Sequence, residues 1–484
     1  MSALSLVPPD RRQLFIAGEW VAPRDGAVFQ VLDPADESVI CEVADASPAD
    51  ALDALAAADS VQDSWASTPP RERGEILRRT FDAIMDQRDD MAELISLEMG
   101  KPLPEAHAEI MYGAEFFRWF AEEAPRISGS WLAAPGGGSR FLTMRRPVGP
   151  CLLITPWNFP IAMAARKIGA AAAAGCTMVV KPAEATPLTT LAVTHMLVEA
   201  GLPAGVLNVV TSLNAAGVSE TLMNDPRLRK VSFTGSTRVG KLLVRQSSNQ
   251  LQRLSMELGG NAPFIVFEDA DLDAAIEGAM VAKMRNMGEA CVAANRFFVH
   301  ASLAEDFAQR LADRMSALQV GRGQEPGVQV GPLINAAAVK NVGSLVDEAV
   351  KDGARLVSGG GSVDGPGYFF RPTVLVDVPQ TSRIANSEIF GPVAAIFTFV
   401  TEEEVVARAN DTEYGLAAYV YTNSTARTIR MAEALQFGMV GFNTGLMSNA
   451  AAPFGGVKHS GYGREGGFEG INEYLQTTYV NLPV

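Results

Sequence analysis

The chain has 484 residues and a formal net charge of −15, because 40 lysine and arginine residues stand against 55 aspartate and glutamate residues. At roughly 150 residues per domain the length predicts about three domains, and the acidic balance disfavours nucleic acid or an anionic membrane as the main partner. The four histidines and four cysteines lie far apart without a CxxC or HExxH motif, so we expect neither a metal centre nor a disulfide framework.

The amino terminus and the longest apolar stretch bear on location. Residues 1–12 lack the basic and continuous apolar regions of a secretory signal. Residues 161–180 are largely apolar, but Arg166 and Lys167 interrupt them, which argues against a membrane span. Because sparse cysteines also suit a reducing compartment, we expect a cytoplasmic protein.

Residues 1–125 are expected to be mostly helical. Residues 48–58 and 71–99 carry apolar side chains at helical spacing with charged residues between them. These apolar stripes predict helices that pack into the core of a first domain.

From about residue 146, short β-branched runs alternate with alanine-rich helical runs. Strand starts recur about every 25 residues, which is the rhythm of a parallel, doubly wound sheet. The predicted strands are 151–155, 178–181, 207–210, 230–234 and 254–258, with helices at 161–174, 189–200 and 239–246.

A second alternating series follows and predicts a second α/β unit. Its strands are expected at 296–300, 369–376, 394–399 and 438–442, and its helices at 304–318 and 336–352.

Two further segments, 139–148 and 471–482, read as strands that neither series needs. Because unpaired strand edges are usually covered, we expect these two segments to pair with each other and with another subunit.

The predicted fold class is therefore α/β, with two doubly wound, Rossmann-like domains and a small β bridging element used for oligomerisation. We assign residues 1–125 and 148–258 to the first domain, 259–459 to the second, and 126–147 and 460–484 to the bridging element.

Two glycine motifs are misleading. Gly461 to Gly466 spell GxGxxG, but too few residues follow for a βαβ unit, so we interpret the segment as a turn. The stretch from Gly235 to Leu242 nearly spells a P-loop, yet Leu242 stands where a hydroxyl must bind magnesium, which disfavours an ATPase. Gly235 and Ser236 still open a helix directly after a strand, which suits a phosphate or simply a tight turn. The chain contains no GxSxG elbow.

The cysteines differ in their surroundings. Cys41, Cys151 and Cys176 lie in apolar, strand-like runs and read as small core residues. Cys291 lies among glycine, asparagine and arginine residues, a polar and bendable setting in which a thiolate can be exposed and stabilised. From the residues alone, a reactive and a structural role for Cys291 stand about equal.

Seven motifs follow one another along nearly the whole chain. They are, in order, Pro156-Trp-Asn-Phe-Pro160, Lys181-Pro-Ala-Glu184, Phe233-Thr-Gly-Ser236, Glu257-Leu-Gly-Gly260, Gly288-x-x-Cys291, Glu388-Ile-Phe-Gly-Pro392 and Pro453-Phe-Gly-Gly456. Together they resemble the aldehyde dehydrogenase superfamily. Within it, residues 283–296 and 268–278 are most similar to succinate-semialdehyde dehydrogenases.

The resemblance implies three catalytic residues. Cys291 matches the nucleophile that forms a thiohemiacetal with the aldehyde, and Glu257 matches the general base that activates the deacylating water. The Asn158 amide and the Cys291 backbone N–H match the donors that stabilise the oxyanion. No metal is implied.

The resemblance also implies a dinucleotide, NAD or NADP, on the first domain, without the usual glycine fingerprint. Lys181 and Glu184 match adenine-ribose positions, Ser236 the pyrophosphate position, and Glu388 with Phe390 the nicotinamide-ribose positions. A carboxylate at 184 would repel a 2′-phosphate, so we expect NAD to be preferred, with NADP as the alternative. Further cofactor contacts are expected at Thr155, Trp157, Gly235 and Leu258.

Three residues match those that bind the distal carboxylate in succinate-semialdehyde dehydrogenases: Arg166, Arg285 and Ser448. Two guanidinium groups and a hydroxyl can neutralise and orient a planar anion, although two structural salt bridges would explain the arginines equally well. Ala293 replaces a second cysteine found in some relatives, which excludes a vicinal disulfide. Glu289 replaces the usual glutamine before the nucleophile, and the sequence does not indicate what this changes.

The resemblance implies NAD(P)-dependent oxidation of succinate semialdehyde to succinate through a cysteine thioester. The alternatives are glutarate semialdehyde or a neutral short-chain aldehyde with the same chemistry and, from a different class, a non-catalytic binding or structural protein on the same scaffold. The expected partners are a small aldehyde and further copies of the chain in a homodimer or homotetramer, without nucleic acid or membrane.

Overall fold

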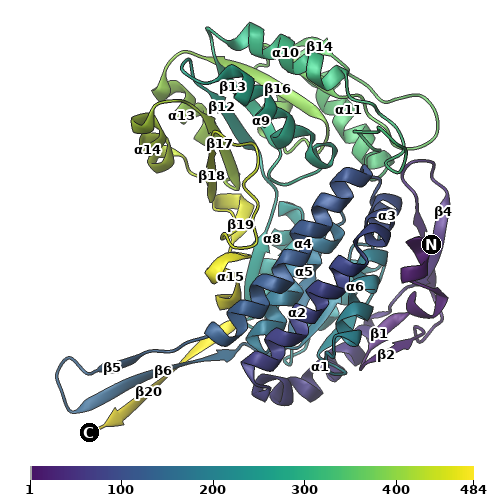
Figure 1. The fold of residues 1–484 in the computed structure, drawn as a ribbon, viewed down its shortest axis with the longest axis vertical. Helices are drawn as coiled ribbons and strands as arrows, with labels where there is room; N and C mark the ends of the chain where they lie inside the picture. Colours follow the sequence, from purple (N-terminus) through teal and green to yellow (C-terminus); the bar gives the residue numbers. More distant parts are fainter. Residues whose placement is uncertain (1–2) are drawn as a thin grey trace.

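The computed structural model describes residues 3–484. Two sheets of mainly parallel strands each carry helices, and a long antiparallel ribbon projects away from both, ending at the C-terminus (Figure 1). The predicted fold class is confirmed, while the exact domain boundaries stay a prediction.

The first sheet has the strand order β19-β11-β10-β7-β8-β9-β1-β2. From β11 to β9 all neighbours are parallel, and the order reverses between β7 and β10, which makes this a doubly wound sheet with a switch point there. Its strands are β1 (Leu14–Ile16), β2 (Glu19–Val21), β7 (Cys151–Ile154), β8 (Met178–Lys181), β9 (Leu207–Val209), β10 (Lys230–Thr234), β11 (Arg253–Glu257) and β19 (Gly461–Tyr462).

Helices cover both faces of this sheet, which explains why its central strands are apolar at successive positions. Leu153 packs into the cluster on one face, and its neighbour Leu152 packs into the cluster on the other. The helices are α1 (Pro48–Ser67), α2 (Pro70–Asp86), α3 (Arg88–Met99), α4 (Leu103–Glu123), α5 (Pro160–Ala174), α6 (Leu188–Glu199), α7 (Ala215–Asn224), α8 (Thr237–Ser247) and α15 (Gly467–Asn472).

The amino-terminal region is less helical than predicted. A β-hairpin of β3 (Val28–Leu32) and β4 (Val39–Ala44) precedes the first long helix. Buried and exposed residues alternate along β3, which is the two-residue period of a strand. The helix predicted over 71–99 is divided at Gln87, whose backbone is not helical. Short 3₁₀ turns η1 (Ala3–Leu6) and η2 (Pro9–Arg11) open the chain, and η3 (Ala124–Arg126) follows α4.

The second sheet has the order β14-β15-β16-β13-β12-β17-β18. Its strands are β12 (Ala262–Val266), β13 (Ala294–His300), β14 (Arg355–Ser358), β15 (Thr373–Val376), β16 (Val393–Phe399), β17 (Ala417–Tyr421) and β18 (Met439–Phe442). Its helices are α9 (Leu272–Met284), α10 (Ala304–Ser316), α11 (Ala336–Lys351), α12 (Arg383–Asn386), α13 (Glu402–Asn410) and α14 (Thr425–Ala434), with η4 (Arg285–Gly288) after α9.

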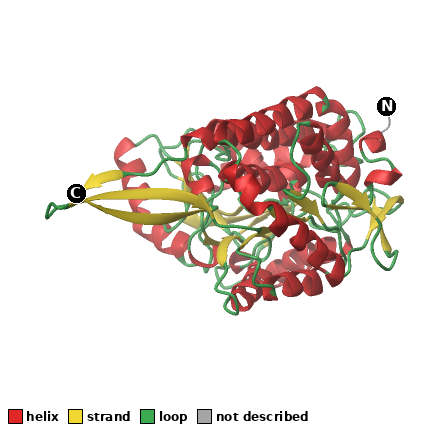
Figure 2. Cartoon of the chain, turned by 90° about the horizontal axis from the view of Figure 1, so that it is seen from below, coloured by secondary structure: helices red, strands yellow, loops and turns green. Residues whose placement is uncertain are grey.

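The projecting ribbon consists of β5 (Trp131–Ala133), β6 (Ser139–Pro147) and β20 (Leu475–Pro483), in the order β20-β6-β5. Strands β6 and β20 pair antiparallel along their full length, as the sequence predicts (Figure 2). Pairing with another subunit stays a prediction.

Two predictions near the C-terminus are wrong in part. Ile471 belongs to helix α15 and not to a strand. The segment that starts at Gly461 is not only a turn, because Gly461 and Tyr462, after η5 (Lys458–Ser460), form a strand antiparallel to β11. None of the helices within residues 3–484 is long and apolar enough to cross a membrane.

Candidate active site

The carboxyl ends of the first sheet gather several of the predicted residues. Lys181 ends β8 level with Ile154 of β7, and Glu257 ends β11 level with Thr234 of β10. Thr155 and Gly235 follow directly after two of these strands. This edge is where doubly wound sheets bind their ligands, so the strand register brings the predicted cofactor residues to the expected crevice.

The turn from β10 into α8 is built as a helix start. The Ser236 hydroxyl accepts a hydrogen bond from the Val239 N–H at 3.4 Å, and the Gly235 N–H donates to the Glu257 carbonyl at 3.0 Å. Leu258 packs so closely on Gly240 that a Cβ there would lie 2.5 Å from the leucine side chain. Tight packing therefore fixes how α8 begins, with its free N–H groups available to a phosphate.

Lys181 and Glu184 form an ion pair at the same sheet edge. The Lys181 Nζ lies 3.2 Å from the Glu184 Oε2, and the lysine is buried while the carboxylate is exposed. A dinucleotide ribose at this edge would meet an acceptor carboxylate next to an ammonium group.

Glu388 and Phe390, predicted at the nicotinamide ribose, lie on the second domain, and the predicted cofactor contact Trp157 lies on the loop after β7. The Trp157 and Phe390 rings meet edge to face with centroids 5.4 Å apart. The Glu388 Oε1 accepts a hydrogen bond from the Gly260 N–H at 3.0 Å. Burial raises the pKa of Glu388 to about 7.

Cys291 lies between η4 and β13, in the second domain. It is half-buried, whereas Cys41, Cys151 and Cys176 are buried, and all four are free thiols. Gly288 has a φ of 76°, and a Cβ there would collide with the Gly391 carbonyl oxygen, so only glycine fits at this position.

Burial raises the pKa of the Cys291 thiol to about 12; the charges of Glu388 and Glu257 also raise it, while Arg166 and Arg285 lower it. The resting thiol is therefore protonated and needs a base. These charges come from residues predicted to bind cofactor or substrate or to act in catalysis, so the Cys291 thiol lies within their electrostatic influence.

Asn158 lies on the loop between β7 and α5, and its side chain reaches the nucleophile loop. Its Nδ2 donates to the Glu289 carbonyl at 2.9 Å. The backbone carbonyl of Asn158 accepts hydrogen bonds from the Lys101 Nζ at 2.9 Å and from the Asn286 Nδ2 at 3.0 Å. An amide nitrogen carries two hydrogens, so one can orient the group on Glu289 while the other remains for a ligand oxygen.

Glu257 is buried at the end of β11. Neither of its carboxylate oxygens has a hydrogen-bond partner among residues 3–484. Burial and the negative charge of Glu465 hold its pKa well above the usual range. A buried carboxyl group with a raised pKa, whose charge influences the Cys291 thiol, has the character of a general base.

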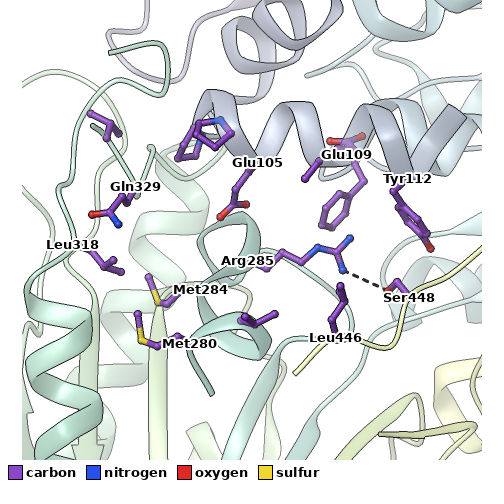
Figure 3. A pocket seen from close by; sticks show the side chains of 16 residues that line it. Glu105, Glu109, Tyr112, Met280, Met284, Arg285, Leu318, Gln329, Leu446 and Ser448 are labelled. Carbon is purple, nitrogen blue, oxygen red and sulfur yellow. Dashed lines mark hydrogen bonds between the residues drawn. The ribbon is translucent and has the colours of Figure 1, made fainter. Parts of the chain in front are cut away.

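A cavity of about 480 Å³ opens between α4 and α9, and Figure 3 shows Arg285 reaching across it. The Arg285 Nη1 donates to the Ser448 Oγ at 3.4 Å, and the guanidinium lies 4.8 Å from the centre of the Phe159 ring. The wall also includes Glu105, Tyr112 and several apolar side chains, namely Met280, Met284, Leu318 and Leu446. Two of the three predicted carboxylate ligands therefore meet in one cavity.

Arg166 lies behind the cavity wall, in contact with the lining residue Tyr112. It is buried inside α5, pairs with Glu465 at 3.2 Å and donates to the Tyr112 hydroxyl at 2.7 Å. The neighbouring Lys167 pairs with the same carboxylate at 2.5 Å. Arg166 is not among the residues that line the cavity of Arg285, and a structural ion pair describes its contacts.

Three charged residues close to the site were missed by the sequence analysis: Lys101, just before α4, and Glu105 and Glu109 in its first turns. Lys101 pairs with Glu109 and donates to the Asn158 carbonyl, while Glu109 accepts from the Ile161 N–H at 3.0 Å. Glu105 accepts from the Asn286 N–H. In the sequence, the only sign of these residues was their spacing of four, which puts three charges on one side of a helix. The same spacing is also typical of a helix side that faces solvent. No cluster of metal-ligating side chains occurs in the part of the chain that the structure describes.

Comparison with known proteins shows the family of the chain. The model of the aldehyde dehydrogenase family matches residues 20–480, so the chain belongs to the aldehyde dehydrogenase family. It is an oxidoreductase of that class.

Its relatives include proteins that act on semialdehydes. The chain is 59% identical to a succinate-semialdehyde dehydrogenase of Paenarthrobacter nicotinovorans, over 92% of this chain and 99% of that protein. It is 47% identical to a glutarate-semialdehyde dehydrogenase of Pseudomonas putida, over 98% of both chains. The crystal structure of succinate-semialdehyde dehydrogenase from Burkholderia pseudomallei superimposes with a TM-score of 0.97 at 49% identity, covering 99% of this chain and 100% of that one.

Proposed function

We propose that the protein oxidises succinate semialdehyde to succinate with NAD as the preferred electron acceptor. The observation that carries this proposal is the Arg285 guanidinium, which crosses the cavity and is hydrogen-bonded to the neutral Ser448 hydroxyl. A guanidinium beside a hydroxyl matches a carboxylate on the substrate. The name of the 59% identical relative supports the same substrate.

In the proposed reaction Cys291 is the nucleophile. Glu257 accepts the thiol proton, and the sulfur adds to the aldehyde carbon to form a thiohemiacetal. The Asn158 Nδ2 and the Cys291 backbone N–H stabilise the oxyanion, because both are donors held beside the reacting carbon. A dinucleotide held at the carboxyl edge of the first sheet would supply the hydride acceptor, and loss of hydride from the thiohemiacetal carbon would leave a thioester on Cys291. Once Glu257 has released the thiol proton to solvent, it takes a proton from the water that attacks the thioester; the C–S bond then breaks, the acid leaves and the Cys291 thiolate takes up a proton.

The carboxyl edge of the first sheet fits a dinucleotide. Seven of the predicted cofactor residues lie on or beside this edge: Thr155, Trp157, Lys181, Glu184, Gly235, Ser236 and Leu258. Two more, Glu388 and Phe390, approach it from the second domain. The exposed Glu184 carboxylate can accept from a ribose 2′-hydroxyl and would repel a 2′-phosphate, which supports a preference for NAD. The Escherichia coli relative, 46% identical over 97% of both chains, is named for NADP, so Glu184 is the residue to test.

In this proposal Arg285 and Ser448 bind the distal carboxylate. Arg166 acts from behind the cavity wall, where its charge lowers the pKa of the Cys291 thiol. The proposal also includes a cytoplasmic location and a homodimer or homotetramer. The assembly is supported by three exposed apolar side chains of the ribbon, Trp131, Leu132 and Tyr479.

The test is NADH formation from aldehydes of two to six carbons, each with and without a terminal carboxylate. We expect kcat/KM to be highest for succinate semialdehyde and lower for its five-carbon homologue. Arg285→Ala should raise KM for succinate semialdehyde far more than KM for propanal. A neutral aldehyde as the best substrate, or an equal effect of Arg285→Ala on both, would overturn the carboxylate site. A five-carbon optimum would replace succinate semialdehyde by glutarate semialdehyde.

A further inference from the structure

The backbone next to Arg285 has an uncommon conformation. Helix α9 ends at Met284, and Arg285 itself leaves the helix with ψ of 125°. Asn286 and Met287 then both adopt left-handed backbone angles, with φ of 55° and 53°. Two successive left-handed residues with side chains are costly, so contacts from outside the loop must stabilise them.

One such contact comes from the other domain. In a continued helix the Asn286 N–H would bond to the carbonyl four residues earlier, but here it donates to the Glu105 Oε2 on α4. This N–H belongs to the peptide plane that joins Arg285 to Asn286. Whatever fixes that plane also fixes the direction in which the Arg285 side chain leaves the backbone.

Glu105 and Arg285 also line the same cavity. Figure 3 shows Glu105 extending from α4 toward the segment that begins at Arg285, while the guanidinium points away toward Ser448. Among residues 3–484 no carboxylate lies within ion-pair distance of the guanidinium, whose contacts are Ser448 and the rings of Phe159 and Tyr112. The Glu105 carboxylate is therefore bonded to the backbone beside Arg285, and the charge of the arginine stays free.

We propose that Glu105 is a positioning residue for Arg285 and thereby determines the preference for carboxylate-bearing aldehydes. Its hydrogen bond to the Asn286 N–H aims the guanidinium into the cavity. This inference rests on the proposed role of Arg285 in binding the substrate carboxylate.

Two substitutions of Glu105 distinguish the effect of its hydrogen bond from the effect of its charge. In Glu105→Gln the amide oxygen still accepts from the Asn286 N–H, whereas Glu105→Ala removes the acceptor and leaves a buried N–H unpaired. We expect Glu105→Ala to lower kcat/KM for succinate semialdehyde about tenfold or more, mainly through KM, and to change kcat/KM for propanal less than about threefold. Glu105→Gln should stay within about threefold of the wild type for both substrates.

The experiment measures both substrates with Glu105→Ala, Glu105→Gln, Arg285→Ala and the double variant Glu105→Ala/Arg285→Ala. Glu122→Ala, at an exposed position of the same helix, is the matched control. Because Glu105 acts through Arg285, the double variant should lose no more activity on succinate semialdehyde than Arg285→Ala alone.

Three results would overturn the proposal. Equal losses on both substrates in Glu105→Ala would indicate a general structural role, and a loss in Glu105→Gln as large as in Glu105→Ala would indicate that the charge matters. Additive losses in the double variant would show that the two residues act independently. If Arg285→Ala itself does not discriminate between the substrates, the carboxylate site fails as well; if it does and Glu105→Ala does not, only this inference fails.

Discussion

The Lys181 ammonium lies 3.2 Å from the Glu184 carboxylate at the carboxyl edge of the first sheet. In the proposed cofactor site Glu184 would have two effects: it would repel a 2′-phosphate, and its ion pair would occupy the lysine that could otherwise bind that phosphate.

Replacing this carboxylate should change the cofactor preference. We expect Glu184→Ser to raise the ratio of kcat/KM for NADP to kcat/KM for NAD about tenfold or more, because the repulsion disappears and Lys181 is released. Steady-state kinetics with both cofactors at saturating aldehyde provides the measurement. Glu199→Ser, an exposed position at the end of α6, is the control and should leave the ratio unchanged. A wild-type enzyme that already prefers NADP would contradict the assignment.

The raised pKa of Glu257 predicts a pH dependence of turnover. Burial and Glu465 keep this carboxyl group protonated above the usual range of a glutamate, so the basic form gains population as the pH rises. We expect kcat to increase from pH 6.5 to pH 9. Glu257→Gln should lower kcat by about 10² to 10⁴-fold and remove this dependence. Glu220→Gln on the exposed side of α7 serves as the control, and an unchanged slope in Glu257→Gln would refute the role of base.

Glu289, beside the nucleophile, should make the folded state sensitive to pH. Its Oε1 accepts from the Ile334 N–H at 3.1 Å, its Oε2 has no partner within the described chain, and burial holds its pKa well above the usual range. Because the unfolded chain releases this proton from about pH 4.3 upward while the folded chain retains it, stability decreases as the pH rises through that interval.

Glu289→Gln keeps the acceptor and removes the titration. We expect the substitution to raise the free energy of unfolding more at pH 8 than at pH 5, and the difference between the two effects should be about 1 to 3 kcal/mol. Thermal unfolding at the two pH values measures this difference, and Glu72→Gln at an exposed position of α2 is the control. The same shift in unfolding temperature at both pH values would show that Glu289 is ionised in the folded protein.

The ribbon should control assembly. Trp131 and Tyr479 are 60% and 57% exposed, and their partners on β6, Leu142 and Thr143, place them on opposite faces of the ribbon. A subunit interface on the Trp131 face would cover this exposed ring. We expect Trp131→Glu to reduce the mass measured by light scattering to that of a smaller species, because a charge would be buried in an apolar contact. Val400→Glu, at an exposed site on the second domain, should not change the mass. An unchanged mass in Trp131→Glu would exclude this face as the interface.

The sequence predicts best the elements whose pattern is local. Strands β8 and β10 begin and end where predicted, because β-branched runs between glycine and proline turns define them. Strand β12 was missed because it starts just after two glycines and contains Pro263, which disguises a central strand. The proposed catalytic residues were assigned from motifs and not from any property visible in each residue alone.

Long-range contacts could not be predicted. Arg166 and Glu465 are separated by 299 residues, and nothing near either one indicates that they form a buried pair. Likewise Glu105 precedes Asn286 by 181 residues, and in a helix its charge reads as solvent-facing. Such contacts follow from how distant segments of the chain meet in the fold, which no local pattern contains.

The left-handed turn after α9 also bears on redesign of the enzyme. Asn286, Met287 and Gly288 all require positive φ, and Gly288 has no room for a Cβ. Random substitution between Arg285 and Cys291 would therefore yield mostly misfolded variants. Met280, Met284 and Leu446 line the same cavity from a regular helix and from an outer loop, where changes of side-chain volume leave the backbone intact. A library meant to accept longer or bulkier aldehydes should vary these three positions and leave the turn as it is.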